Sequence, residues 1–227
     1  MPIVGYVVAA REEGPVSDWE SRAMDAAQDA YMEELYREHS EMAIQEFRSE
    51  RLRSYYRNNP TLADHARRML ADARSLSDSH PGASLVLSAS SVELAVKVLL
   101  LKPMVFGLVH VESAADLVAE LVITHTGMER FRGLLFEIMA KHAGIDLSSY
   151  SRTSSPPTLW NEICLLQSRR NAVLHRGEIV IAEDAQIGIA IADTLLSRLF
   201  EALLEKLGLH SHDDGQVCED PHEPSYP

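Results

Sequence analysis

The chain has 227 residues, 46% of them apolar and 24% charged, so it is long enough and apolar enough to bury a hydrophobic core. Aromatic residues make up only 6%, which argues against a sandwich or barrel of many short strands. The net charge of −13 argues against a protein that coats nucleic acid through bulk electrostatics, although it allows a local basic cleft. The two cysteines, Cys164 and Cys218, have neither disulfide-framework nor zinc-finger spacing, which favours a reducing, cytoplasmic compartment.

The first 80 residues predict an N-terminal helical extension. From Asp18 to about Tyr56 no proline or glycine interrupts a sequence rich in helix-forming residues, which predicts one long helix or two abutting ones. The segment 58–60 (Asn-Asn-Pro) ends this helix. Thr61 is placed to cap a short second helix.

Residues 81–208 predict a bundle of four or five amphipathic helices. The first helix, over 83–102, is almost entirely apolar and is expected to end at Pro103, because the residue before a proline avoids the helical conformation. Two charges in the middle of this segment, Glu93 and Lys97, argue against a membrane span and indicate a core helix with one polar stripe.

The remaining predicted helices of the bundle cover about 112–123, 128–143, 159–176 and 183–207. The sequence Ser-Ser-Pro-Pro-Thr before residue 159 favours a helix start, and Gly208 is placed to end the last helix.

Residues 209–227 predict a disordered acidic tail. They contain five acidic residues, no Lys or Arg, and little apolar surface to bury. His210 and His212, followed by two aspartates, offer metal ligands, but in such a tail we expect any metal binding to be incidental and assign no metal ligands.

The predicted helix 159–176 carries the candidate chemistry. At about 100° per residue, its apolar residues form one core stripe, made of Leu159, Ile163, Leu166, Val173 and Leu174. Arg170 falls near the middle of that stripe and needs a partner such as Glu93 or Glu162, because an unpaired buried charge costs several kcal/mol. Asn171 and His175 are neighbours on the adjoining face, and the helix dipole favours protonated His175 in the last turn.

Residues 170–175 (Arg-Asn-Ala-Val-Leu-His) match the R-x4–6-H motif of the HEPN superfamily, whose members usually place a polar residue directly after the arginine. The motif closes the third long helix of the bundle and is followed by Gly177 and a final helix. An earlier apolar helix bears a glutamate, Glu93, as in many members. Residues 81–208 therefore resemble a HEPN domain, whereas the first 80 residues do not take part in the resemblance.

The resemblance implies a bundle that dimerises with its motif helices facing each other. In nuclease members the composite cleft cuts RNA without metal or cofactor and leaves a 2′,3′-cyclic phosphate. Arg170 would then bind the phosphate, His175 would transfer protons, and Asn171 would orient His175 or donate to the phosphate. Arg170 and His175 point about 140° apart on one helix, which favours a site built from two copies. Arg169 and Arg176 are candidate auxiliary phosphate contacts or solvated helix-end cations, and Glu93 is a candidate site residue or a partner of Lys97.

Three functions are compatible with these observations. The first is a metal-independent endoribonuclease of the toxin or antiviral-defence kind. The second is a non-catalytic module that binds a protein or a nucleotide, with Arg170 in an interior ion pair; the net charge favours it, because RNA would approach against the overall field. In the third, residues 1–80 carry the function by binding a protein such as an antitoxin or a component of a defence complex.

Overall fold

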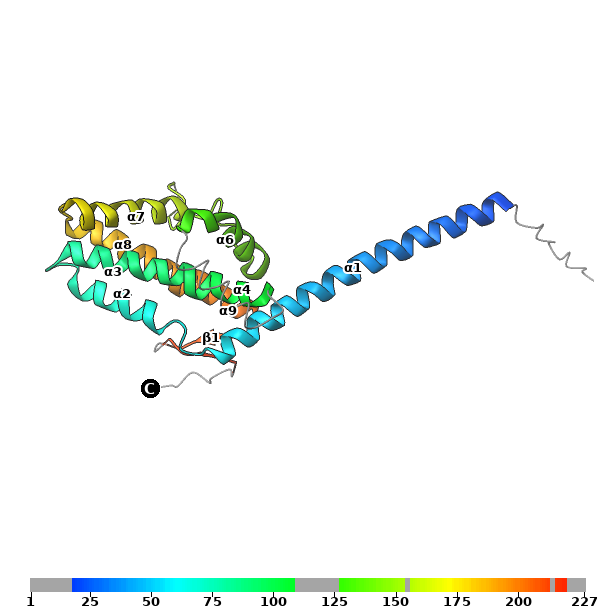
Figure 1. Ribbon diagram of the computed structural model, residues 1–227, viewed down its shortest axis with the longest axis horizontal. Coiled ribbons are helices and arrows are strands. Elements are labelled where there is room, and N and C mark those ends of the chain that lie inside the picture. The colour runs from blue at the N-terminus through cyan, green and yellow to red at the C-terminus, as the bar shows by residue number, and fades with distance from the viewer. Residues whose placement is uncertain (1–17, 109–126, 154–155, 213–214, 220–227) are drawn as a thin grey trace, which may run out of the picture. The chain divides into compact units, whose positions relative to one another are not determined.

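The structure, a computed structural model, describes residues 18–108, 127–153, 156–212 and 215–219, which are mostly helical (Figure 1). This confirms the all-helical class. The chain divides into two units, Met1–Glu46 and Phe47–Pro227, and helix α1 (Asp18–Asn58) contributes to both. The predicted helix over 112–123 lies outside the described residues.

Helix α1 is one continuous helix, not two abutting ones. It ends two residues before Pro60, as the sequence predicts. In the first unit its described side chains are mostly exposed, including the large aromatic residues Trp19, Tyr31 and Tyr36.

The second unit is a helical bundle in which α3 (Pro81–Leu94) occupies a central position. Helix α3 packs against α2 (Asp64–Leu76), α7 (Leu159–Arg176) and α8 (Ala182–Thr194), and Figure 1 shows it between α2 and α7. Two buried serines of α3 bond to backbone carbonyls of α2, so their hydroxyl groups are satisfied inside the core.

The other elements complete the bundle. They are the π-helical turn η1 (Ala95–Leu101), α4 (Lys102–Leu108), the 3-10 turn η2 (Met128–Phe131), α6 (Arg132–Ile138), and the π-helical turns η3 (Met139–Ala143) and η4 (Leu195–Phe200), followed by α9 (Glu201–Lys206). The helical runs 128–143 and 182–206 match the predicted helices. Gly144 and Gly208, both at φ 69°, end these runs in the left-handed conformation that favours glycine.

The prediction that Pro103 ends its helix is wrong. Helices α3, η1 and α4 form one helical run, and Pro103 lies within α4. Pro103 has no N–H to donate to the preceding turn, where the register is π-helical and the Lys102 N–H bonds to the carbonyl of Lys97, five residues earlier. The hydroxyl of Tyr56 donates to the carbonyl of Leu99 in that turn, at 2.5 Å, and so supplies a donor where the proline removes one.

The segment Pro81–Phe106 is long and apolar enough to span a membrane by length and composition, but 61% of its most apolar window is buried inside the protein. Leu85, Leu99 and Leu100 are each at most 1% exposed. Such burial is typical of a core helix, as the sequence predicts.

The limits of the bundle differ from those expected. We placed a boundary at residue 80, but Leu52, Tyr56 and Leu70 share one hydrophobic core with residues of the 81–208 segment. Helix α2 also begins later than predicted, at Asp64, and Thr61 does not cap it; the N-cap is Ala63, without a side-chain hydrogen bond.

Residues 209–212 and 215–219 differ from the expected disordered tail. Strands β1 (His210–Ser211) and β2 (Val217–Cys218) form an antiparallel hairpin. Leu209 and Val217 are buried, and the Val217 N–H donates to the Pro60 carbonyl at 2.8 Å. Two buried apolar side chains and one backbone hydrogen bond thus hold the hairpin against the rest of the second unit, although its composition predicts a solvent-exposed tail. Residues 220–227 lie outside the described residues.

Candidate functional site

Local capping fixes the limits of α7, the helix that carries the motif. The Thr158 hydroxyl accepts from the Asn161 N–H at 3.4 Å, and Gly177 takes a left-handed conformation at φ 66°. The N–H groups of Gly177 and Glu178 bond to the carbonyls of Val173 and Ala172. The motif therefore occupies the last two turns of α7, as the sequence predicts.

Arg170 makes an ion pair with Glu93 on the neighbouring α3. Its Nη2 lies 2.7 Å from Glu93 Oε2, and the two side chains are 23% and 30% exposed. The other oxygen of Glu93 accepts from Lys97 Nζ at 2.8 Å, so one carboxylate holds two cations. Glu162, the other expected partner, is paired with Arg152 through two hydrogen bonds of 2.6 and 2.8 Å.

Asn171 contacts Arg170 directly. Arg170 Nη1 donates to Asn171 Oδ1 at 3.0 Å, which leaves the Asn171 Nδ2 group able to donate to another molecule. Arg170 Nε is buried and has no hydrogen-bond partner among the described residues. The guanidinium thus bridges the motif helix and the glutamate helix.

A cavity of about 490 Å³ opens beside this cluster. Glu93, Arg170 and Asn171 contribute to its wall, together with Gln167 and the segment 127–129. The Gln167 amide is held by the Ala89 carbonyl at 3.2 Å. The wall therefore offers charged and hydrogen-bonding groups to a polar ligand.

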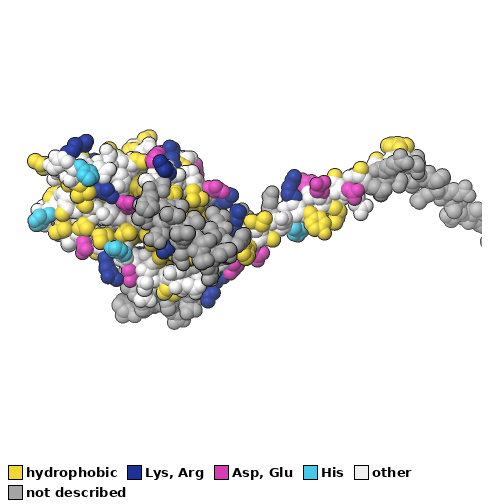
Figure 2. Space-filling view, viewed as in Figure 1, with side chains coloured by type: hydrophobic (Ala, Val, Ile, Leu, Met, Phe, Trp, Pro, Cys, Tyr) yellow, Lys and Arg dark blue, Asp and Glu magenta, His cyan; other side chains and the backbone are white. Residues whose placement is uncertain are grey.

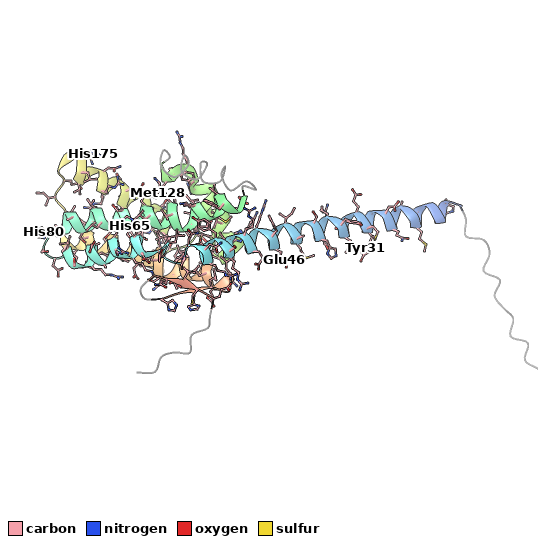
Figure 3. The ribbon with its side chains drawn as sticks, turned by 60° about the horizontal axis from the view of Figure 1, so that its bottom comes forward. Tyr31, Glu46, His65, His80, Met128 and His175 are labelled. Carbon is pink, nitrogen blue, oxygen red and sulfur yellow. The ribbon has the colours of Figure 1, made fainter. Side chains whose placement is uncertain are left out.

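His175 is exposed and does not line this cavity. It follows Asn171 by four residues and so lies about 40° from it around α7. Figure 3 shows His175 near the C-terminal end of α7, at the end of the bundle where His80 precedes α3, and Met128 of the cavity wall lies farther from that end. Within one chain the structure joins Arg170, Asn171 and Glu93, but does not bring His175 into their cluster.

Arg169 and Arg176 both contact carboxylates. Arg169 makes a two-pronged ion pair with Asp184 near the start of α8, and this hydrogen bonding raises the pKa of the arginine. Arg176 is 73% exposed and lies 3.8 Å from Glu178. Arg169 thus links α7 to α8, while Arg176 stays accessible to solvent.

Cys164, Met128 and Glu129 also line the cavity wall. The Cys164 thiol donates to Glu129 Oε2 at 3.2 Å, and burial together with this carboxylate raises the pKa of the thiol to about 11. A thiol that stays protonated at neutral pH is a poor nucleophile. Helical spacing places Cys164 on the face of Asn171 and predicts a packing role rather than a nucleophile, whereas no local signal marks Met128 and Glu129 of η2 as part of the cavity wall.

The surface around the end of α7 is rich in exposed apolar side chains. Leu174 is 54% exposed, so the prediction that it belongs to the core stripe is wrong. Gly82 of α3 lies opposite Val173 and has no side chain that could cover the last turn of α7. Ile179 and Ile181, in the connection to α8, are 88% and 58% exposed. On the face of the second unit seen in Figure 2, basic and acidic side chains are interspersed.

Comparison of the chain with protein-family models, with curated proteins and with solved structures yields no match. The arrangement of side chains therefore carries the functional argument.

Proposed function

We propose that the chain is a metal-independent endoribonuclease, HEPN-like in its bundle, with Arg170, Asn171 and His175 as catalytic residues of a site shared by two copies. One observation carries the proposal: the Arg170–Asn171 pair lines an open cavity, and an exposed histidine, His175, follows Asn171 by one turn on the side of α7 that Asn171 occupies. The proposed setting is the cytoplasm, with RNA as substrate and an antitoxin or defence protein as regulator.

The side chains match the needs of ribose 2′-hydroxyl attack on the adjacent phosphate. A base must take the proton of that hydroxyl and an acid must protonate the leaving oxygen; histidine titrates near neutrality and performs such transfers, typically for a factor of about 10²–10⁴. The planar guanidinium of Arg170 presents parallel donors to phosphate oxygens, and Asn171 Nδ2 adds a neutral donor. Arg176, which is exposed in the last turn of α7, is the better candidate for an auxiliary phosphate contact, because Arg169 already forms an ion pair with Asp184.

A second copy of the chain supplies what one copy lacks. Arg170 and His175 diverge on one helix, so a twofold-related helix is needed to direct one residue of each kind at the same phosphate. The exposed apolar side chains Leu174, Ile179 and Ile181 lie beside the motif and would be buried by such an association.

The test is RNA cleavage by the purified full-length chain in the presence of a chelator. We expect products with 2′,3′-cyclic phosphate ends from wild type, no cleavage of an RNA with a 2′-deoxy residue at the scissile position, and loss of activity in His175→Ala. The matched control is His80→Ala, another exposed histidine at the same end of the bundle, which should cleave like wild type. Equal cleavage by wild type and His175→Ala, or none by either, contradicts the proposal.

Mixing variants tests the shared site. Arg170→Ala and His175→Ala are each expected to be inactive, but a mixed dimer keeps one site with a wild-type arginine from one copy and a wild-type histidine from the other. Random mixing should therefore restore about one quarter of the active sites. No restoration would indicate that both residues act from the same chain.

A second candidate function is a non-catalytic module that binds a protein or a nucleotide. The observation that favours it is that Glu93 and Glu129 lie on the cavity wall and offset the charges of Arg170 and Lys97, so the cluster has no excess positive charge for a phosphate. Arg170→Ala separates the two functions: a folded, inactive variant supports catalysis, whereas unfolding supports an interior ion pair.

In the third candidate function, residues 1–80 bind the partner. The exposed aromatic side chains of α1 favour this surface.

A further inference from the structure

The C-terminal hairpin brings three metal-binding side chains to one face. His212 directly follows strand β1, and its N–H donates to the Gln216 carbonyl across the hairpin at 2.8 Å. Cys218 is paired with His210 in the antiparallel register, so its side chain shares that face. The backbone of the hairpin therefore brings the three residues together.

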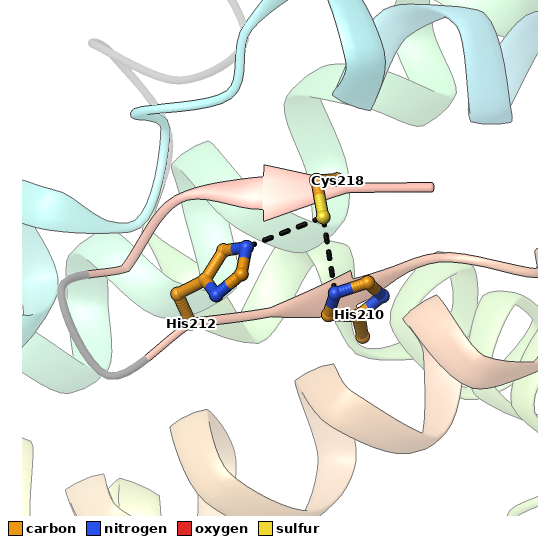
Figure 4. A group of neighbouring side chains, drawn as sticks. All are labelled: His210, His212 and Cys218. Carbon is orange, nitrogen blue, oxygen red and sulfur yellow. Dashed lines mark hydrogen bonds between the residues drawn. The ribbon is translucent and has the colours of Figure 1, made fainter. Parts of the chain in front are cut away.

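The ligand atoms lie slightly closer together than they would around a bound ion. Cys218 Sγ is 3.0 Å from His210 Nε2 and 3.2 Å from His212 Nε2, and all three atoms lie within 4.8 Å of one another (Figure 4). A tetrahedral zinc ion with ordinary bond lengths keeps its sulfur and nitrogen ligands about 3.5 Å apart. A small outward movement of each side chain admits the ion.

Hydrogen bonding alone accounts poorly for two imidazole nitrogens on one sulfur. A thiol carries a single proton and can donate to one of them, so the other must donate to sulfur, a weak acceptor. A thiolate bound to a metal ion, with a neutral imidazole on either side, uses all three atoms as electron-pair donors.

The backbone around these residues is held in place before any ion binds. Glu219, which follows Cys218, pairs with Arg53 and Arg57 at 3.0 and 3.1 Å. The Ser211 hydroxyl accepts from Arg67 Nη2 at 2.6 Å. Such support reduces the entropy that binding an ion must overcome.

We propose that His210, His212 and Cys218 bind one zinc-type divalent ion, which cross-links the two sides of the C-terminal hairpin. Thiolate and imidazole ligands select zinc or cobalt over calcium or magnesium, which prefer oxygen. The three described ligands leave a fourth tetrahedral position, which a water molecule can fill. This site is separate from the α7 cluster, and the inference does not depend on the proposed ribonuclease activity.

The first test is titration of the chelator-treated full-length chain with Co²⁺. We expect one equivalent to bind, with a thiolate-to-cobalt charge-transfer band and the intense visible bands of tetrahedral cobalt, and Zn²⁺ to remove both. Cys218→Ser should abolish the charge-transfer band, and His212→Gln should weaken binding at least about tenfold. Cys164→Ser, which removes the other cysteine, is the matched control and should retain the full spectrum.

The second test uses wild-type protein alone and so does not depend on variants that fold. Alkylation by iodoacetamide is followed at each cysteine by peptide mass spectrometry, with and without Zn²⁺. We expect zinc to slow the modification of Cys218 at least about tenfold and to leave Cys164 unchanged. Equal modification of Cys218 in both conditions, a cobalt spectrum without a thiolate band, or a band that survives in Cys218→Ser would each overturn the site.

Discussion

The Tyr56 hydroxyl in α1 donates a 2.5 Å hydrogen bond to the carbonyl oxygen of Leu99, a residue 43 positions later in the chain. Tyr56 is fully buried, and burial raises the pKa of its hydroxyl, which therefore stays protonated and able to donate. The bond supplies a donor to the turn that precedes Pro103, where the proline has no N–H to offer. A contact between distant segments thus supports the helical run at the point where local sequence predicts a break.

Tyr56→Phe is expected to lower the free energy of unfolding by about 1–3 kcal/mol, because it removes a buried hydrogen bond to the Leu99 carbonyl. Urea denaturation measures this loss. In a Pro103→Ala background the new N–H adds a donor to the same turn, so the cost of Tyr56→Phe should be smaller there. Equal costs in both backgrounds would show that the tyrosine and the proline are not coupled.

Glu93→Gln is expected to lower the free energy of unfolding by about 1–3 kcal/mol, because two partly buried cations, Lys97 and Arg170, lose their shared carboxylate. Chemical denaturation measures the change. Glu137→Gln is the control. The Glu137–Lys141 pair has the same four-residue spacing as the Glu93–Lys97 pair but is exposed, so loss of the Glu137 charge should have no measurable effect on stability. A similar loss in both variants would mean that the shared carboxylate has no special role.

The second unit should become less stable as the pH falls below about 6.5, the ordinary pKa of histidine. Burial, together with the positive charges of Lys141 and Arg48, lowers the pKa of His142. The unfolded chain then binds a proton at His142, near pH 6.5, before the folded chain does, so stability is full above about pH 6.5 and is lost as the pH falls through the lowered folded pKa.

Urea denaturation of wild type and His142→Asn at pH 7.5 and 5.5 measures this effect. The variant should lose less stability between the two values than wild type. His80→Asn, at an exposed histidine, is expected to keep the wild-type difference. An unchanged difference in His142→Asn would remove this histidine as the cause.

Gly215→Ala should destabilise the protein more than Gly177→Ala does. Both glycines have positive φ, 93° and 66°, so each substitution carries backbone strain of about 1–3 kcal/mol. At Gly215 a Cβ atom would also lie 3.0 Å from Asp64 Oδ1, whereas at Gly177 nothing lies within 4 Å. Thermal unfolding compares the two, and equal shifts would show that the contact with Asp64 is accommodated without cost.

Local chemistry made much of the fold predictable from the sequence. The ends of α7 and of the last helical run follow from Thr158, Gly177 and Gly208, whose capping depends only on neighbouring residues. The packing of Leu52 and Tyr56 into the bundle was not predictable, because two apolar residues one turn apart in a charged helix give only a weak periodic signal.

Part of the candidate site was predictable from the sequence and part was not. An arginine on an apolar stripe requires an acidic partner, and Glu93 was one of two candidates for it. The contribution of Glu129 to the cavity wall depends on how a connection folds back onto α7, which no short sequence pattern encodes. No sequence pattern joins Cys218 to the two histidines, because the register of a two-residue strand pair leaves almost no signal in composition.

Ser88 of α3 and Gly188 of α8 limit each other's size. A Cβ atom on Gly188 would lie 3.2 Å from both Ser88 Cβ and Leu166 Cδ1, so neither helix can gain bulk here alone. As the sequence diverges over evolutionary time, enlargement at one of these positions should be accompanied by reduction at the other. The crossing of the two helices would then persist as a covarying pair among descendants whose other residues have changed.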